Sequence, residues 1–155
     1  MPKSINKLGV AIPIVAVSAL MLMAPMLAAA QNPHFVNASA SRSGNNLVCS
    51  FKEAGLGSGQ EVTITCSAEA TANYQCINKG GKNPSAENKR TVNEEVSESG
   101  DFTATKSGQV TGSVTVSPPD AGDFTCPSGQ RLTLVSVTYE NVVLTDETTG
   151  ASEEL

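Results

Sequence analysis

Residues 62–76 read VTITCSAEATANYQC, and this stretch decides the fold class. Every even position holds an apolar, small or aromatic side chain, and every odd position holds a polar one. Successive side chains of a β-strand point to opposite faces, whereas a helix would place neither set on one face. Alternation over 15 residues therefore predicts a half-buried antiparallel strand, or two strands joined by a bend.

Outward from this stretch, short segments of strand-like composition alternate with loops rich in glycine, proline and asparagine. The pattern predicts an all-β fold, an immunoglobulin-like antiparallel β-sandwich of about seven or eight strands. A glycine-rich loop at 55–59 indicates a hairpin that joins the strand at 47–52 to the alternating stretch. The other expected strands lie at 91–97, 102–105, 109–117 and 131–145, and Phe35 with Val36 could start one more.

Two of these segments carry further information. Residues 91–97 are polar on both faces, which predicts an edge strand, and glutamates there and just beyond oppose pairing with another sheet. Alternation within 131–145 slips near 134–135 and again near 142–143. Each slip predicts a β-bulge.

The first 30 residues have the features of a signal peptide. Lys3 and Lys7 precede 23 uncharged residues that end in three alanines, so cleavage before Gln31 is expected. An uncleaved anchor through residues 8–30, with the domain at the outer face of the membrane, is the alternative, because this stretch is long enough to span a bilayer. In either case the sequence predicts export, with membrane contact only through this segment.

The rest of the chain suits one domain. We expect a polar N-terminal segment at 31–46, the β-sandwich at 47–147 and an acidic, loose tail at 148–155. Ten basic residues stand against 15 acidic ones, and two of the basic residues lie in the first 30, which leaves eight against 15, a net charge of −7. An acidic domain without a basic patch repels phosphate backbones, so nucleic acid is not an expected partner.

The chain has four cysteines, an even number that predicts two disulfides in an exported domain. Cys66 and Cys76 would lie about 33 Å apart on a straight strand, too far to form a bond. Of the two remaining pairings, the expected hairpin favours Cys49–Cys66 with Cys76–Cys126. No closely spaced cysteine pair suggests zinc or redox chemistry.

The sequence offers little for catalysis, and we expect no enzyme activity, cofactor or metal. The only histidine, His34, lies near the expected mature N-terminus. Carboxylates acting alone could support a hydrolase, or two of their loops a calcium site, but turns and strand ends commonly carry such acids. The candidates are Asp101, Asp120, Asp123, Glu140, Asp146 and Glu147. Asn37 begins the sequon Asn-Ala-Ser, a possible glycosylation site.

Several stretches resemble a family of small secreted proteins of unknown function. They are residues 51–57 (FKEAGLG), 74–84 (YQCINKGGKNP), 108–113 (GQVTGS), 116–119 (VSPP), 126–130 (CPSGQ) and 137–146 (VTYENVVLTD). The resemblance implies a Cys76–Cys126 bridge shared with relatives and Cys49–Cys66 as an additional one. It implies no activity.

Taken together, these features predict an exported, non-enzymatic structural or interaction module. Its partner would be a protein or a cell surface. The alternative is a secreted inhibitor or effector that acts through an exposed loop at 78–89, and a carboxylate-dependent hydrolase comes third.

Overall fold

The computed structural model describes residues 31–81 and 88–155, which form seven β-strands. In chain order these are β1 (His34–Ser43), β2 (Asn46–Ala54), β3 (Glu61–Asn78), β4 (Lys89–Thr103), β5 (Gln109–Val116), β6 (Gln130–Asp146) and β7 (Ser152–Glu154). The segments expected at 91–97 and 102–105 are one continuous strand, β4. The expected signal peptide, residues 1–30, lies outside the described residues.

The strands form two antiparallel sheets, one with the order β1-β2-β5 and one with the order β4-β3-β6-β7. This arrangement confirms the predicted all-β antiparallel sandwich. β4 lies at an edge, as its polar composition predicted. Glu94 and Glu98 pair with Ala70 and Cys66 of β3 and are exposed at that edge. Charged side chains on an edge strand oppose pairing with another sheet.

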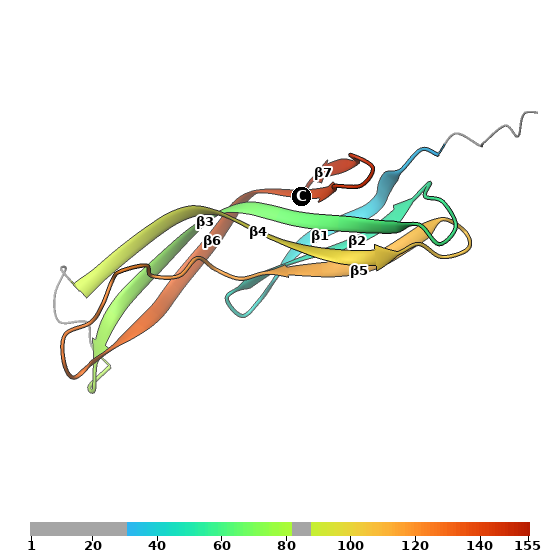
Figure 1. Ribbon diagram of the computed structural model, residues 1–155. Coiled ribbons are helices and arrows are strands. Elements are labelled where there is room, and N and C mark those ends of the chain that lie inside the picture. The colour runs from blue at the N-terminus through green and yellow to red at the C-terminus, as the bar shows by residue number, and fades with distance from the viewer. Residues whose placement is uncertain (1–30, 82–87) are drawn as a thin grey trace, which may run out of the picture.

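The molecule is elongated because β3, β4 and β6 extend past the three-stranded sheet (Figure 1). We call this extension the arm, and it comprises residues 69–78, 89–95 and 130–140, which pair with one another. The chain between β5 and β6, residues 117–129, runs along the arm (Figure 1). It contacts the arm where the Tyr74 hydroxyl donates a hydrogen bond of 2.6 Å to the Pro119 carbonyl oxygen.

The alternation of β3 places its even-numbered side chains in the core. Val62, Ile64 and Cys66 lie between the two sheets, in a cluster that also contains Phe51 and Leu144. In the arm the buried hydrophobic residues are small: Ala70, Ala72, Cys76 and Val137. The run of alanines in the sequence therefore marks the place where the sandwich gives way to the arm.

Residues 55–60 do not form the hairpin expected from the sequence. β2 pairs with β1 and β5, whereas β3 pairs with β4 and β6, so the chain crosses here from one sheet to the other. Gly55 and Gly59 have φ angles of 83° and 71°, in the left-handed region that favours glycine. A crossover needs such angles as much as a hairpin does, which is why glycine content alone gave the wrong connection.

Both predicted bulges are present in β6. Ser67 pairs with Val143 but Glu69 pairs with Glu140, so β6 holds an extra residue between them, and Asn141 adopts a φ of 51°. The second bulge is at Val135, which lies between the partners of two consecutive β3 residues. Each bulge reverses the side-chain parity of β6, and this reversal is the slip seen in the sequence.

The domain is longer at both ends than the expected 47–147. The N-terminal segment supplies β1, which pairs with β2 along nearly its whole length. The C-terminal tail is not loose, because β7 pairs with residues 143–145 of β6 and the Leu155 amide donates to the Val142 carbonyl. Composition alone predicted loops here because β1 and β7 bury few side chains.

A first prediction concerns the turn between β4 and β5. Replacing Gly108 with alanine should lower the free energy of unfolding by about 3 kcal/mol, because its φ is 71° and an added Cβ would collide with the Leu56 carbonyl. Gly59 has the same φ but open space around it, so Gly59→Ala is the matched control with an expected loss of about 1 kcal/mol. Urea unfolding measures both, and equal losses would contradict the packing argument.

Candidate functional site

The two disulfides join the residues that the sequence predicted. Cys49 of β2 bonds to Cys66 of β3, and Cys76 of β3 bonds to Cys126. The reason given for the first pairing was incorrect, since Cys49 and Cys66 lie on different sheets rather than on neighbouring strands of a hairpin. The Cys49–Cys66 bridge therefore links the two sheets through the core, and the Cys76–Cys126 bridge fastens residues 117–129 to the arm.

Two acidic side chains lie inside the sandwich, which is the least expected feature of the molecule. Glu53 of β2 and Asp146 at the end of β6 are both 0% exposed and come from opposite sheets. No hydrogen-bond donor in the described residues reaches either carboxyl oxygen of Glu53. A buried carboxylate without a donor or counter-ion is costly, so this pair requires a physical explanation.

Asp146 is satisfied by the turn that follows it. Its Oδ1 accepts hydrogen bonds from the amides of Thr148 and Thr149 at 2.8 and 3.2 Å, and its Oδ2 accepts one from the Thr149 hydroxyl at 2.7 Å. Its backbone amide donates to Ala151. Asp146 thus shapes the turn that returns the chain to β7.

Glu53 is the member of the pair that holds a proton. Burial raises the pKa of Glu53 from 4.5 to about 7, with further contributions from repulsion by the Asp146 carboxylate and from the hydrogen bond that protonated Glu53 can donate to Asp146. Glu53 is therefore largely protonated below pH 7. Both carboxyl groups are 0% exposed, so the pair bears on the stability of the fold.

The acids that the sequence singled out do not converge. Asp101 lies on β4, Glu140 on β6, and Asp120 with Asp123 in the 117–129 segment, while Asp146 is buried and Glu147 is exposed. Asp120 accepts a hydrogen bond from the Gly122 amide, so it caps a turn much as Asp146 does. Within residues 31–81 and 88–155, no three histidine, cysteine, aspartate or glutamate side chains are placed to share a metal ion.

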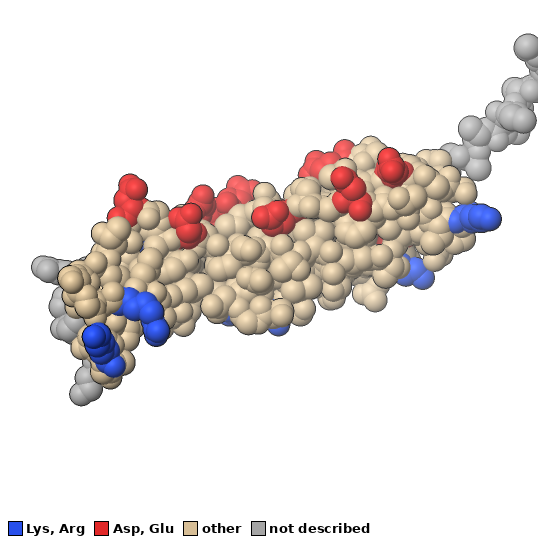
Figure 2. Space-filling view, turned by 60° about the horizontal axis from the view of Figure 1, so that its bottom comes forward, with Lys and Arg blue, Asp and Glu red and all other residues tan. Residues whose placement is uncertain are grey.

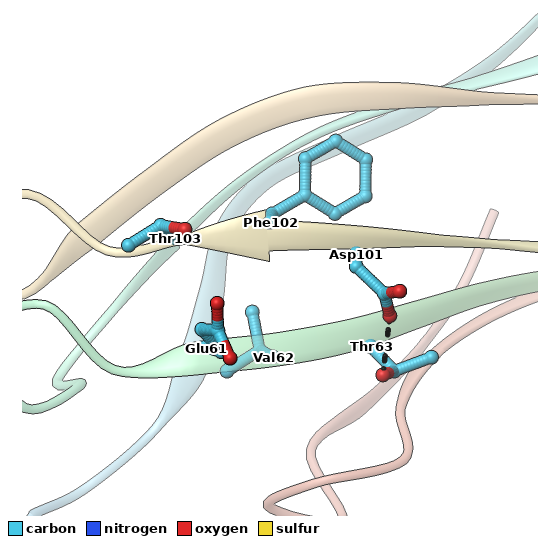
Figure 3. A pocket seen from close by; sticks show the side chains of 6 residues that line it. All are labelled: Glu61, Val62, Thr63, Asp101, Phe102 and Thr103. Carbon is cyan, nitrogen blue, oxygen red and sulfur yellow. Dashed lines mark hydrogen bonds between the residues drawn. The ribbon is translucent and has the colours of Figure 1, made fainter.

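A hollow at the end of the β3–β4 pair has two carboxylates in its lining. It has a volume of about 350 Å³ and is lined by Glu61, Val62, Thr63, Asp101, Phe102 and Thr103 (Figure 3). The Thr63 hydroxyl donates a hydrogen bond of 2.7 Å to Asp101 (Figure 3). This contact is an ordinary cross-strand pair, and the lining contains no histidine or cysteine that could act as base or nucleophile.

The outer face of the four-stranded sheet is broad, polar and open. It carries the odd-numbered side chains of β3 with their neighbours on β4 and β6, mostly threonine, serine and asparagine. One row across three strands consists of Glu95, Glu69 and Glu140, which are direct cross-strand partners. We call these three residues the glutamate row. Acidic side chains gather along one long side of the molecule (Figure 2).

The glutamate row leads to a second prediction. Like charges directly opposite each other destabilise a sheet, so Glu95→Lys should raise the free energy of unfolding by about 0.5–1 kcal/mol at low salt. The gain should shrink in high salt because both side chains are exposed. Ser97→Lys is the control, since Ser97 pairs with Ser67 and should gain little. Equal effects of the two lysines would show that cross-strand repulsion is not the cause.

The remaining expected residues are exposed or lie beyond the described chain. His34 is exposed at the start of β1, and its Nδ1 hydrogen-bonds the Asn32 carbonyl at 2.8 Å. Asn37 is exposed on β1 beside a bulge, where its side chain is accessible. Of the loop at 78–89 that was considered for an inhibitor, residues 82–87 lie outside the described residues.

Sequence reasoning missed Glu53 although its signal was present. Leu47, Cys49 and Phe51 are odd-numbered core residues of β2, and Glu53 continues the same parity. Extending the strand by two residues would have placed this glutamate inside. Asp146 likewise follows Val142 and Leu144 on the buried face of β6.

No protein-family model and no curated protein matches this chain. Among the described residues, no helix is long and apolar enough to cross a membrane. The two disulfides indicate an oxidising environment, since such bonds persist mainly outside the reducing cytosol.

Proposed function

We propose that this chain is an exported, non-enzymatic interaction module that acts outside the cytoplasm. The observation that carries the proposal is the pair of disulfides, one between the sheets and one on the arm. Cytosolic proteins rarely keep such bonds, and residues 8–30 have the apolar composition of an export signal. Release before Gln31 is part of the proposal, and retention through residues 8–30 is its alternative.

The outer face of the four-stranded sheet is the surface that we propose for a partner. The glutamate row on it consists of three exposed side chains that are direct cross-strand partners, and Glu69 also accepts a hydrogen bond of 2.9 Å from the Asn141 side-chain amide. A protein or cell surface with basic groups would relieve the repulsion within the row. This surface supports the interaction proposal better than the 78–89 loop of the inhibitor alternative, which is only partly described.

An immunoglobulin-like relationship belongs to the same proposal. Its support is the seven-stranded, two-sheet architecture with a disulfide between the sheets. The chain lacks the tryptophan that packs on that bridge in antibody domains. We therefore propose only a similar architecture.

Intact-mass analysis of the culture medium of the native host tests export. The expected product begins at Gln31 and is four hydrogens lighter than the reduced chain, because both bridges are closed. Detection only in membranes with Met1 retained would replace secretion with anchoring. Free thiols in the native protein would overturn the proposal of an oxidising compartment.

Retention of secreted or surface proteins by the immobilised mature chain tests the interaction. The triple variant Glu69→Gln, Glu95→Gln, Glu140→Gln removes the charge of the row, and Lys52→Gln on the other sheet is the matched control. A partner held by wild type and the control but lost by the triple variant is the expected result. Equal retention by all three proteins would rule out the glutamate row as the binding surface.

A further inference from the structure

We propose that Glu53 and Asp146 form a pH-sensitive latch, which keeps residues 148–155 docked on the four-stranded sheet below neutral pH and releases them as the pH rises. This inference concerns a different part of the molecule from the surface proposed for a partner. It does not depend on the proposed function.

The geometry of the pair is the first argument. The two carboxyl groups approach from opposite sheets, and both are fully buried. Glu53 receives no hydrogen bond from the described residues, so an ionised Glu53 would have neither a donor nor water to stabilise it. One proton between the two carboxyl groups removes this cost, and loss of that proton restores it.

The surroundings offer no compensating charge. Besides Asp146, no described group changes the pKa of Glu53. Apart from Glu53 and Asp146, every described aspartate, glutamate, lysine, arginine and histidine side chain is exposed, and the two tyrosines, Tyr74 and Tyr139, are half-buried. The exposed side chains on the packed strands and their connections include His34 and Arg42 on β1, Lys52 on β2, Glu61 and Glu69 on β3, Glu98 and Asp101 on β4, Lys106 before β5, Glu140 on β6, Glu147 after β6, and Glu153 with Glu154 on β7.

The C-terminal segment, residues 148–155, is the part of the domain that can detach most easily. β7 has three residues, all exposed, and pairs only with 143–145. The turn before it is built on the side-chain and backbone hydrogen bonds of Asp146. In contrast, β2 is paired on both sides and linked to β3 through Cys49. Elements with few buried contacts open first, so repulsion within the pair should displace the Asp146 turn rather than β2.

Opening would change the surface of the molecule. Release of β7 exposes the backbone groups of residues 143–145, which then become a free sheet edge able to accept another strand. It also removes Leu155 from its contact with the main core. The latch would thus make a hidden edge increasingly available as the pH rises toward 7.

Amide hydrogen exchange of the oxidised mature chain between pH 4 and pH 8 tests the latch. After correction for intrinsic exchange rates, protection of the amides of Asp146, Gly150 and Leu155 should fall up to tenfold per pH unit from about pH 5 to pH 7 and level off above pH 7, because opening releases a proton only while Glu53 is protonated in the closed state and ionised in the open state. Glu53→Gln cannot lose a proton and should remove this dependence. Glu61→Gln, an exposed acid, should leave it unchanged.

The outcomes are decisive even if Glu53→Gln folds poorly. In wild type, a loss of protection confined to 143–155, with the centre of β3 still protected, supports the latch. Constant protection at all these pH values overturns it. A parallel loss of protection throughout β3 also overturns it, because the pair would then act on the whole fold. A Glu53→Gln variant that folds but keeps the wild-type dependence overturns it as well.

Discussion

Replacing Cys76 and Cys126 with alanine is expected to lower the free energy of unfolding by about 4 kcal/mol. The bridge spans 50 residues, and closing a loop of this length removes that much conformational freedom from the unfolded chain. The loss is comparable to the whole free energy of unfolding of a small domain, so a large fraction of the variant should be unfolded even without denaturant. Urea unfolding of oxidised wild type and variant measures it.

The Cys49→Ala, Cys66→Ala variant is the comparison for this prediction. Its loop spans 17 residues, for which chain entropy gives about 3 kcal/mol. The two variants should also lose structure in different regions. Cys126 attaches the 117–129 segment to the arm, whereas Cys49 links the two sheets. A loss below 1 kcal/mol on removing Cys76–Cys126 would mean that the arm is held by its other contacts, such as that of Tyr74 with Pro119.

The free energy of unfolding of wild type is expected to fall by about 2–3 kcal/mol between pH 5 and pH 8 through Glu53 alone. The pKa of Glu53 is raised in the folded state, from 4.5 to about 7. A raised folded pKa adds stability that is fully present below the unfolded pKa of 4.5 and is lost as the pH rises through 7. The domain should therefore be more stable in mildly acidic than in mildly alkaline solution.

Glu53→Gln isolates this contribution, since glutamine is a neutral isostere of the protonated acid. The variant should show a much smaller fall over the same pH range, so the difference between the two proteins should change by about 2–3 kcal/mol. Glu61→Gln should follow wild type. Parallel curves for wild type and Glu53→Gln would contradict a buried, protonated Glu53. If the C-terminal latch opens first, the fall should level off once residues 148–155 are released.

The outcomes of the individual predictions show which features of this fold can be predicted from a single sequence. The bulges of β6 were predictable because each bulge shifts the alternation of apolar and polar residues by one position, and this shift is visible in the sequence. The crossover at 55–60 was not, because a glycine-rich loop permits a hairpin or a change of sheet equally well. The cysteine pairing was right although the supporting geometry was wrong, since excluding Cys66–Cys76 had already reduced the choices to two.

The sequence by itself determined the all-β class and the inward face of β3, and it reduced the possible pairings of the four cysteines to two. These follow from local rules, namely the two-residue period of a strand and the distance between two positions on it. Only the tertiary structure decided which strands share a sheet and that Glu53 meets Asp146 in the core. Glu53 and Asp146 are 93 positions apart in the sequence. They come together because the two sheets pack on each other, and no local pattern in the sequence encodes this packing.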